Sequence, residues 1–230
     1  MKRSIPLFAA ILLCSLFTQA QNATAKSGGT TFGIRAGVNF QNINGKDASD
    51  KKLSNDLITG FNVGVNAEIP VAPEFYFQPG LLFSTKGAKN SEVVAGQTIK
   101  SSIHISYVEL PLNFLFKPTL GTGHLLLGFG PYVALGVGGK AKYEAAGVSV
   151  TEDIKFKKNV SASDPQDMVY FKPIDAGASL LAGYEFSNKL SFQLNAQLGM
   201  LKINPDYEGN SNDKTSAKNT GFGLSVGYRF

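Results

Sequence analysis

Apolar residues alternate strictly with small or polar residues along the last eleven positions of the chain, 220–230. A period of two predicts a β-strand with one apolar face and one small or polar face. In a water-soluble protein the apolar face packs on a core. In a membrane barrel the apolar face meets lipid and the other face fills the interior. The rest of the chain decides between these two interpretations.

The same alternation recurs seven more times and predicts eight strands, and the connections between them alternate in length. The predicted strands are 31–41, 61–69, 75–84, 107–116, 125–137, 174–186, 190–200 and 220–230. Long polar connections at 42–56, 86–100, 138–172 and 202–219 alternate with short ones at 70–74, 117–124 and 187–189. Outer-membrane barrels have this plan, with long loops outside and short turns on the periplasmic side. We therefore predict an all-β fold, an eight-stranded antiparallel outer-membrane barrel with both termini in the periplasm.

Charge follows the same alternation. No apolar-face position of these strands carries a charged residue, whereas Gly, Ala, Ser and Asn dominate the opposite face. Such small residues suit the interior of a narrow barrel, while a soluble barrel would need that face to be its wet exterior. The charges expected in the lumen are Arg35, Glu68, Glu109, Asp175, Glu185 and Arg229. Buried charges must be paired, so we predict a salt-bridged plug; the alternative is a path for protons, ions or small solutes.

The N-terminus has the pattern of an export signal. Lys2 and Arg3 precede the apolar run 5–17, and small residues stand at Thr18 and Ala20 before a predicted cleavage. The predicted organisation is a signal peptide at 1–20, a short periplasmic segment at 21–30 and the barrel at 31–230. Acylation at Cys14, the single cysteine, is the alternative, but the bulky Leu13 before it disfavours a lipoprotein.

Composition excludes several classes of function. The formal charge of +5 falls to +3 without Lys2 and Arg3, too small and scattered to predict nucleic-acid binding. Two histidines, with no cysteine left after cleavage, do not predict a metal site. The segment Gly-Phe-Gly at 128–130 lacks the third glycine of a dinucleotide loop, so no cofactor is predicted.

Two motifs suggest catalysis. His104 and Ser106 share the lipid-facing phase of Val108 near the outer end of a strand, where an outer-membrane lipid A deacylase places a His and a Ser. The histidine could act as a general base for the serine, although no carboxylate stands in phase to orient it. The segment 223–227 matches a nucleophile elbow, but that motif needs a following helix and the sequence continues to alternate. We predict a chain without enzymatic activity; a lipid-modifying enzyme is the alternative.

Several segments resemble a known family. The final strand, YVELPLNFLFKP at 107–118, GFGPYVALGVGGKAKYE at 128–144 and IDAGASLLAGYEF at 174–186 are similar to the PorT-like outer-membrane barrels of Bacteroidetes-type bacteria. The resemblance covers nearly all of the chain after residue 20. It implies a barrel in the outer membrane, and the member after which the family is named is linked to type IX secretion.

The predicted role is that of a monomeric scaffold. Val226, Tyr228 and Phe230 resemble the C-terminal signal that the barrel-assembly machinery recognises. Other expected partners are outer-membrane lipid, lipopolysaccharide through loop lysines, and a secretion or other envelope complex. Function beyond the scaffold would reside in the outer loops, above all 138–172, as adhesion, ligand capture or docking.

Overall fold

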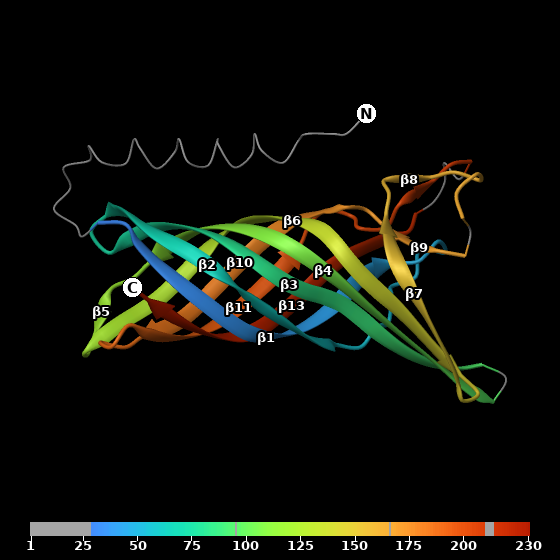
Figure 1. Ribbon diagram of the computed structural model, residues 1–230, viewed down its shortest axis with the longest axis horizontal. Helices are drawn as coiled ribbons and strands as arrows, with labels where there is room; N and C mark the ends of the chain where they lie inside the picture. Colours follow the sequence, from blue (N-terminus) through green and yellow to red (C-terminus); the bar gives the residue numbers. More distant parts are fainter. Residues whose placement is uncertain (1–28, 95, 166, 210–213) are drawn as a thin grey trace.

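The computed structural model describes residues 29–94, 96–165, 167–209 and 214–230. The expected signal peptide, and all but the last two residues of the expected periplasmic segment, lie outside these residues. Eight long strands form a closed ring in the order β1, β2, β3, β4, β6, β10, β11, β13 and back to β1 (Figure 1). Their bounds are β1 Thr31–Lys46, β2 Ile58–Ala72, β3 Phe75–Val94, β4 Gln97–Phe116, β6 Gly123–Ala145, β10 Ile174–Glu185, β11 Leu190–Gly199 and β13 Ser216–Arg229. The predicted eight-stranded antiparallel barrel is confirmed.

Closure of the ring depends on the first and last strands. β1 pairs with β13 from Gly33 opposite Arg229 to Lys46 opposite Ser216. The backbone N–H of Phe230 also donates to the carbonyl oxygen of Phe32 at 2.8 Å. A closed ring leaves no unpaired strand edge in the hydrocarbon, where water cannot satisfy backbone groups. Among the described residues, no helix is long and apolar enough to cross a membrane.

The alternation of the sequence becomes the inside and outside of the barrel wall. The aromatic and aliphatic side chains of the apolar faces point outward, as shown by Phe129 and Leu180, each 62% exposed. Their neighbours along the same strands, such as Leu181, are buried inside. The arrangement is inside-out relative to a soluble protein, as a lipid environment requires.

Several strands are longer than predicted. Residues 86–100, expected to form a polar loop, continue β3 and β4 into a hairpin whose pairing runs on to Val94 opposite Gln97. Most of the expected loop 138–172 also forms strands: the end of β6, β7 Val148–Phe156, β8 Asn159–Val160 and β9 Val169–Phe171. In this barrel the alternation is strict where one face of a strand meets lipid. Above the membrane, polar residues such as Ser101 and Glu152 interrupt the apolar face, so the pattern weakens while the hydrogen-bonded ladder continues.

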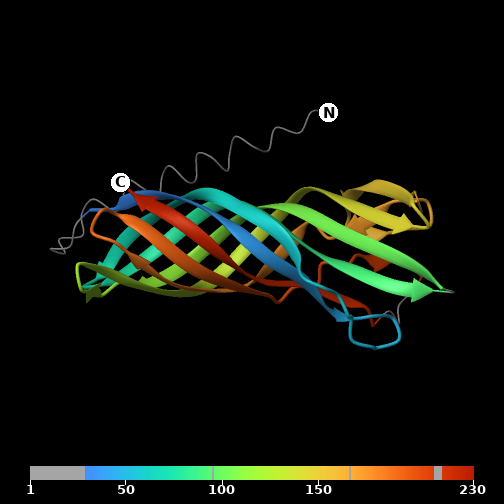
Figure 2. The same ribbon diagram turned by 90° about the horizontal axis from the view of Figure 1, so that it is seen from below.

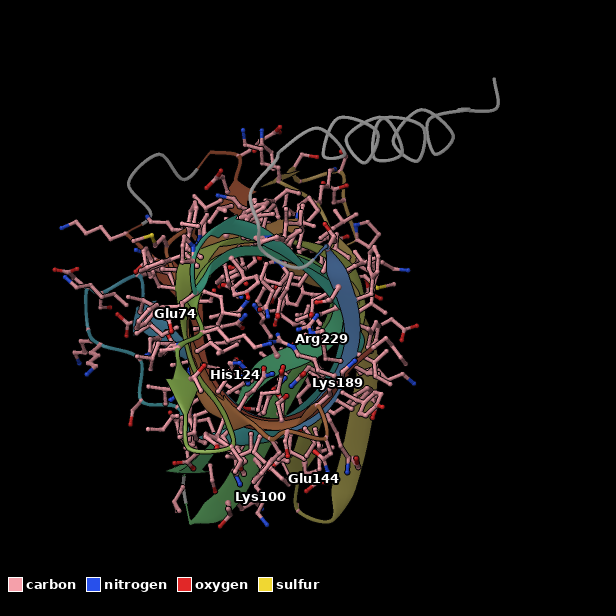
Figure 3. All side chains as sticks on the ribbon, turned by 90° about the vertical axis from the view of Figure 1, so that its left-hand side faces the viewer. Glu74, Lys100, His124, Glu144, Lys189 and Arg229 are labelled. Carbon is pink, nitrogen blue, oxygen red and sulfur yellow. The ribbon has the colours of Figure 1, made fainter. Side chains whose placement is uncertain are left out.

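The extended part of β3, β4, β6 and β7 leans out beyond the barrel. A register shift interrupts the pairing of β4 with β6 at Ser106 and Tyr107. On the adjacent strand Gly87 has a φ of 154°, and a Cβ there would lie 1.8 Å from the carbonyl oxygen of Ile103. Bulges and glycines of this kind bend strands. Viewed along the barrel, Lys100 and Glu144 lie outside its circular outline (Figure 3). We call this part, formed by 87–94, 97–106, 138–145 and 148–153, the extracellular sheet.

The remaining short strands accompany the loops. β5 Thr119–Leu120 pairs with β6 in a short connection, and β12 Asp206–Tyr207 pairs with β8. Turned by 90°, the molecule shows the short connections at the end where the C-terminus lies and the longer ones at the other (Figure 2). The extracellular end of the interior is filled by an apolar cluster, to which Ile154 and Phe171 contribute from the folded connection and Ile203 from the connection before β13.

Candidate functional site

The barrel interior contains the six charged residues predicted for it. Arg35, Glu68, Glu109, Asp175, Glu185 and Arg229 are all buried. Five of them belong to two clusters at different heights, each organised around a lysine, and Arg35 lies apart from both. Strand register places them, because side chains that are far apart in sequence meet inside an eight-stranded barrel, whose interior is just wide enough for side chains to fill.

The lower cluster lies at the periplasmic end around Lys117. Its Nζ lies 2.9 Å from Oε2 of Glu68 and 2.8 Å from Oε1 of Glu185. Arg229 forms an ion pair with the other oxygen of Glu68, and Gln78 donates to that oxygen at 3.2 Å. Figure 3 shows Arg229 inside the ring. The Glu68 carboxylate therefore forms ion pairs with two cations and accepts a hydrogen bond from one amide. These interactions compensate for the loss of water around it.

The upper cluster is built around Lys86. Its Nζ lies 2.9 Å from Oε2 of Glu109 and 3.2 Å from Oδ2 of Asp175. The ammonium also lies 4.1 Å from the ring centroid of Tyr132, a cation–π geometry. Asn219 donates to the Asp175 carboxylate at 3.0 Å. All of these side chains are almost fully buried.

Lys86 and Lys117 are the residues that sequence reasoning missed, since both were assigned to connections. A signal was available in the phase of the strands. Lys86 continues the inward series of Leu82 and Ser84, and Lys117 continues that of Leu115. With these two lysines, the described interior contains four buried cations and four buried carboxylates: Arg35, Lys86, Lys117 and Arg229 with Glu68, Glu109, Asp175 and Glu185. The formal charge of this set is zero.

The rest of the lumen is packed with polar and apolar side chains. Arg35 donates to Oδ1 of Asn195 at 3.3 Å, and Asn62 donates to Asn39 at 2.6 Å. A cavity beside Arg35 and Glu109 has a volume of about 20 Å³, room for about one water molecule. Together with the apolar cluster above Lys86, this packing fills the interior through most of its height.

The predicted catalytic pair lies on the outside of β4. His104 is exposed, opposite Gly87 on β3 and Lys140 on β6. Ser106 is half-buried, opposite Thr85 and Gly138. Within the described part of the chain no hydrogen bond joins the two side chains, and neither has a carboxylate directly opposite on an adjacent strand. A histidine without an orienting carboxylate lacks the third member of a Ser-His-acid arrangement.

The three residues of the predicted assembly signal line the outer face of β13 and the residue after it. Val226, Tyr228 and Phe230 are all exposed on the lipid side. The rings of Tyr228 and Phe230 meet edge to face with centroids 5.5 Å apart. They stand beside the seam where β13 closes on β1. In the described residues, no group of His, Cys, Asp and Glu side chains is arranged to hold a metal ion.

The family comparison agrees with this architecture. A family model described as outer membrane protein beta-barrel domain matches residues 19–204. No curated protein sequence matches the chain. Three solved structures serve as examples. Each is covered along its full length and itself covers 88% of this chain. Ail, the attachment invasion locus protein of Yersinia pestis, is 15% identical with a TM-score of 0.39. Neisserial surface protein A is 10% identical with a TM-score of 0.44.

The third structure, a major outer membrane protein from Thermus thermophilus, is 14% identical with a TM-score of 0.46. The family match covers most of the chain and agrees with the closed ring of outward-facing apolar strands. It also places the protein in the cell outer membrane. This chain belongs to the outer membrane protein beta-barrel domain family.

Proposed function

We propose that this protein is a non-enzymatic outer-membrane scaffold that docks a partner protein through its extracellular sheet. Adhesion, ligand capture and docking to an envelope complex are the roles that such a surface serves. The observation that carries the proposal is the free edge of β7. Barrels remove sheet edges, yet here a strand edge is presented outside the membrane above a filled lumen.

The free edge spans the first part of β7. Val148 to Asp153 pair on one side with β6, and in the described part of the chain no strand pairs with their other side. The next three residues, Ile154 to Phe156, pair with β9. An unpaired row of backbone N–H and C=O groups is a template for an added strand. The edge is therefore suited to an extended segment of another protein.

The turn before β7 identifies which backbone groups are free. Ala146 and Gly147 both have positive φ, at 50° and 80°, as a type I′ two-residue hairpin requires. In such a hairpin the closing pair, Ala145 and Val148, exchanges hydrogen bonds. By alternation Ser149, Thr151 and Asp153 turn their N–H and C=O groups away from β6.

Side chains beside this edge favour an apolar partner face. Ile99, Tyr143, Val148 and Val150 share one face of the extracellular sheet, and Val148 is 65% exposed. This is the face that continues the lumen side of the barrel. A bound strand with apolar residues at alternate positions would cover these groups, and its backbone would supply the missing ladder.

A proline on the free edge tests the proposal. Thr151→Pro removes an N–H that points away from β6, so the barrel and the β6–β7 hairpin should form normally. Thr151→Ala keeps the N–H and serves as the control. A photo-crosslinking amino acid at Tyr143 reports contacts in intact cells. We expect crosslinks to an extended segment of a partner in the parent and the alanine variant, and their loss in the proline variant. Equal crosslinking in all three, or none in the parent, would refute edge pairing.

The finer aspects of the proposal follow from the residues. The C-terminal Val226, Tyr228 and Phe230 would be recognised by the barrel-assembly machinery, and the protein would act as a monomer because its ring closes without a second copy. Membership of the PorT-like branch is proposed from the segments at 107–118, 128–144 and 174–186. A secretion complex would then be one candidate partner for the β7 edge.

A further inference from the structure

The other face of the extracellular sheet carries lysines from three adjacent strands. Strand register sets them in rows. In one row Lys89 of β3, Ser102 of β4 and Lys142 of β6 stand side by side. In the next row Lys100 of β4 stands between Ser91 and Glu144. Directly opposite residues point to the same face of a sheet, so Lys89, Lys100 and Lys142 lie on the same face as Ser102.

These residues line a cleft of about 340 Å³. Two carboxylates also line it, Glu144 and Asp56, and a third, Asp153, stands opposite Lys140 on the same face. Glu144 is paired with Lys142. Within the described residues neither Lys89 nor Lys100 forms a side-chain ion pair. The cleft is lined by three lysines and two carboxylates, so it has a surplus of positive charge.

One ion pair and one backbone contact position the two carboxylates of the cleft. The hydrogen bond from Lys142, and then its charge with that of Lys100, holds the pKa of the Glu144 carboxyl below its ordinary value. Asp56 is held at the edge of the sheet by two backbone hydrogen bonds with Lys89, of 2.7 and 3.2 Å. The arrangement is thus a defined set of charges across three strands and one loop, rather than a single flexible side chain.

The cleft faces the membrane surface. Lys100 continues the outward phase of Val108 on β4, and beyond the bulge Lys142 lies on the same outer face as Leu135 of β6; Val108 and Leu135 belong to the apolar band. The extracellular sheet leans outward, since Lys100 and Glu144 lie outside the outline of the barrel (Figure 3). We infer that the outer face of a sheet inclined in this way is directed back toward the surrounding leaflet. The change from exposed apolar side chains to lysine, serine and histidine occurs at the bulge beside Ser106. Such a change marks the level where hydrocarbon gives way to headgroups.

We propose that this cleft binds a phosphate group of lipopolysaccharide in the outer leaflet, with Lys89, Lys100 and Lys142 as the cationic ligands and Ser102 as a hydroxyl donor. Phosphate oxygens accept strong charge-assisted hydrogen bonds, and lysine binds phosphate as a point charge. The position beside the apolar band selects a phosphate carried by a lipid over one in free solution. The bound lipid would steady the extracellular sheet on the membrane, leaving its opposite face exposed.

Binding of bisphosphorylated lipid A to the full chain in detergent micelles tests the proposal. The variant replaces Lys89, Lys100 and Lys142 with glutamine. The control replaces three exposed loop lysines, Lys51, Lys52 and Lys158, with glutamine. It therefore removes the same amount of charge. We expect binding about tenfold or more weaker in the cleft variant, and close to the parent in the control. Lipid A without phosphates should bind the parent as weakly as phosphorylated lipid A binds the cleft variant.

Three results would overturn the proposal. Equal losses in the two triple variants would show that net charge alone attracts the lipid. Equal binding of lipid A with and without phosphates would remove phosphate as the recognised group. Inorganic phosphate that bound the parent as tightly as lipid A would exclude the lipid as the selected source. Identical far-ultraviolet circular dichroism of all variants establishes that the barrel is folded.

Discussion

Replacing Lys86 by methionine would test whether the buried charges hold the barrel together. Methionine keeps the unbranched side chain up to the Cε position and removes the ammonium group. Glu109 and Asp175, each exposed by no more than 1% of its surface, would lose the ammonium that lies 2.9 Å from one and 3.2 Å from the other. Removing one partner of a buried pair costs about 3–5 kcal/mol, because the remaining charge is left without water or a counterion.

The matched comparison is an exposed ion pair. Lys46 and Asp50 lie 2.9 Å apart, but both side chains are about half exposed, so Lys46→Met should cost no more than about 1 kcal/mol. The assay is urea unfolding in detergent micelles followed by far-ultraviolet circular dichroism, since the chain contains no tryptophan. A free energy of unfolding reduced equally by the two substitutions would refute the reasoning.

A second substitution separates charge from packing. Asp175→Asn in the Lys86→Met background removes one of the two uncompensated carboxylates while keeping its shape. We expect it to recover about 1–3 kcal/mol of the loss, the penalty of a buried group left unsatisfied. The same substitution in the parent should destabilise, because Lys86 would then lose a partner. If Asp175→Asn had the same effect in both backgrounds, the two residues would not be coupled.

Four further outcomes are expected. Deleting Phe230 should reduce the folded barrel in the outer membrane fraction, and unchanged assembly would show that Tyr228 and Val226 suffice. Gly130→Ala should destabilise by about 1–3 kcal/mol, because its Cβ would lie 2.1 Å from the carbonyl oxygen of Leu112, whereas Gly138→Ala, with open space, should not; urea unfolding compares them. Planar bilayers containing the protein should show no conductance, and steady single-channel steps would contradict a filled lumen. Lipid A mass spectra should be identical with and without His104→Ala, since a difference would favour the lipid-modifying alternative.

The sequence alone determined the membrane barrel and the direction in which most of its side chains face. Strict alternation at 220–230, and its seven counterparts, is a local property that needs no knowledge of partners. The absence of charge from the apolar faces identified the lipid side for the same reason. The inward direction of Arg35, Glu68 and the other predicted lumen charges followed from phase alone.

Only the tertiary structure decided which charges meet and how far the strands extend. Lys86 and Lys117 follow the ends of the predicted strands 75–84 and 107–116, and so fall in predicted connections. Ring closure places them instead against carboxylates that stand on three other strands, and no local pattern encodes those distances. The extracellular sheet was missed for a related reason. Above the membrane, backbone pairing continues although polar residues such as Ser101 and Glu152 interrupt its apolar face. The free edge on β7 and the lysine rows depend on register and bending, which arise only when the whole sheet closes.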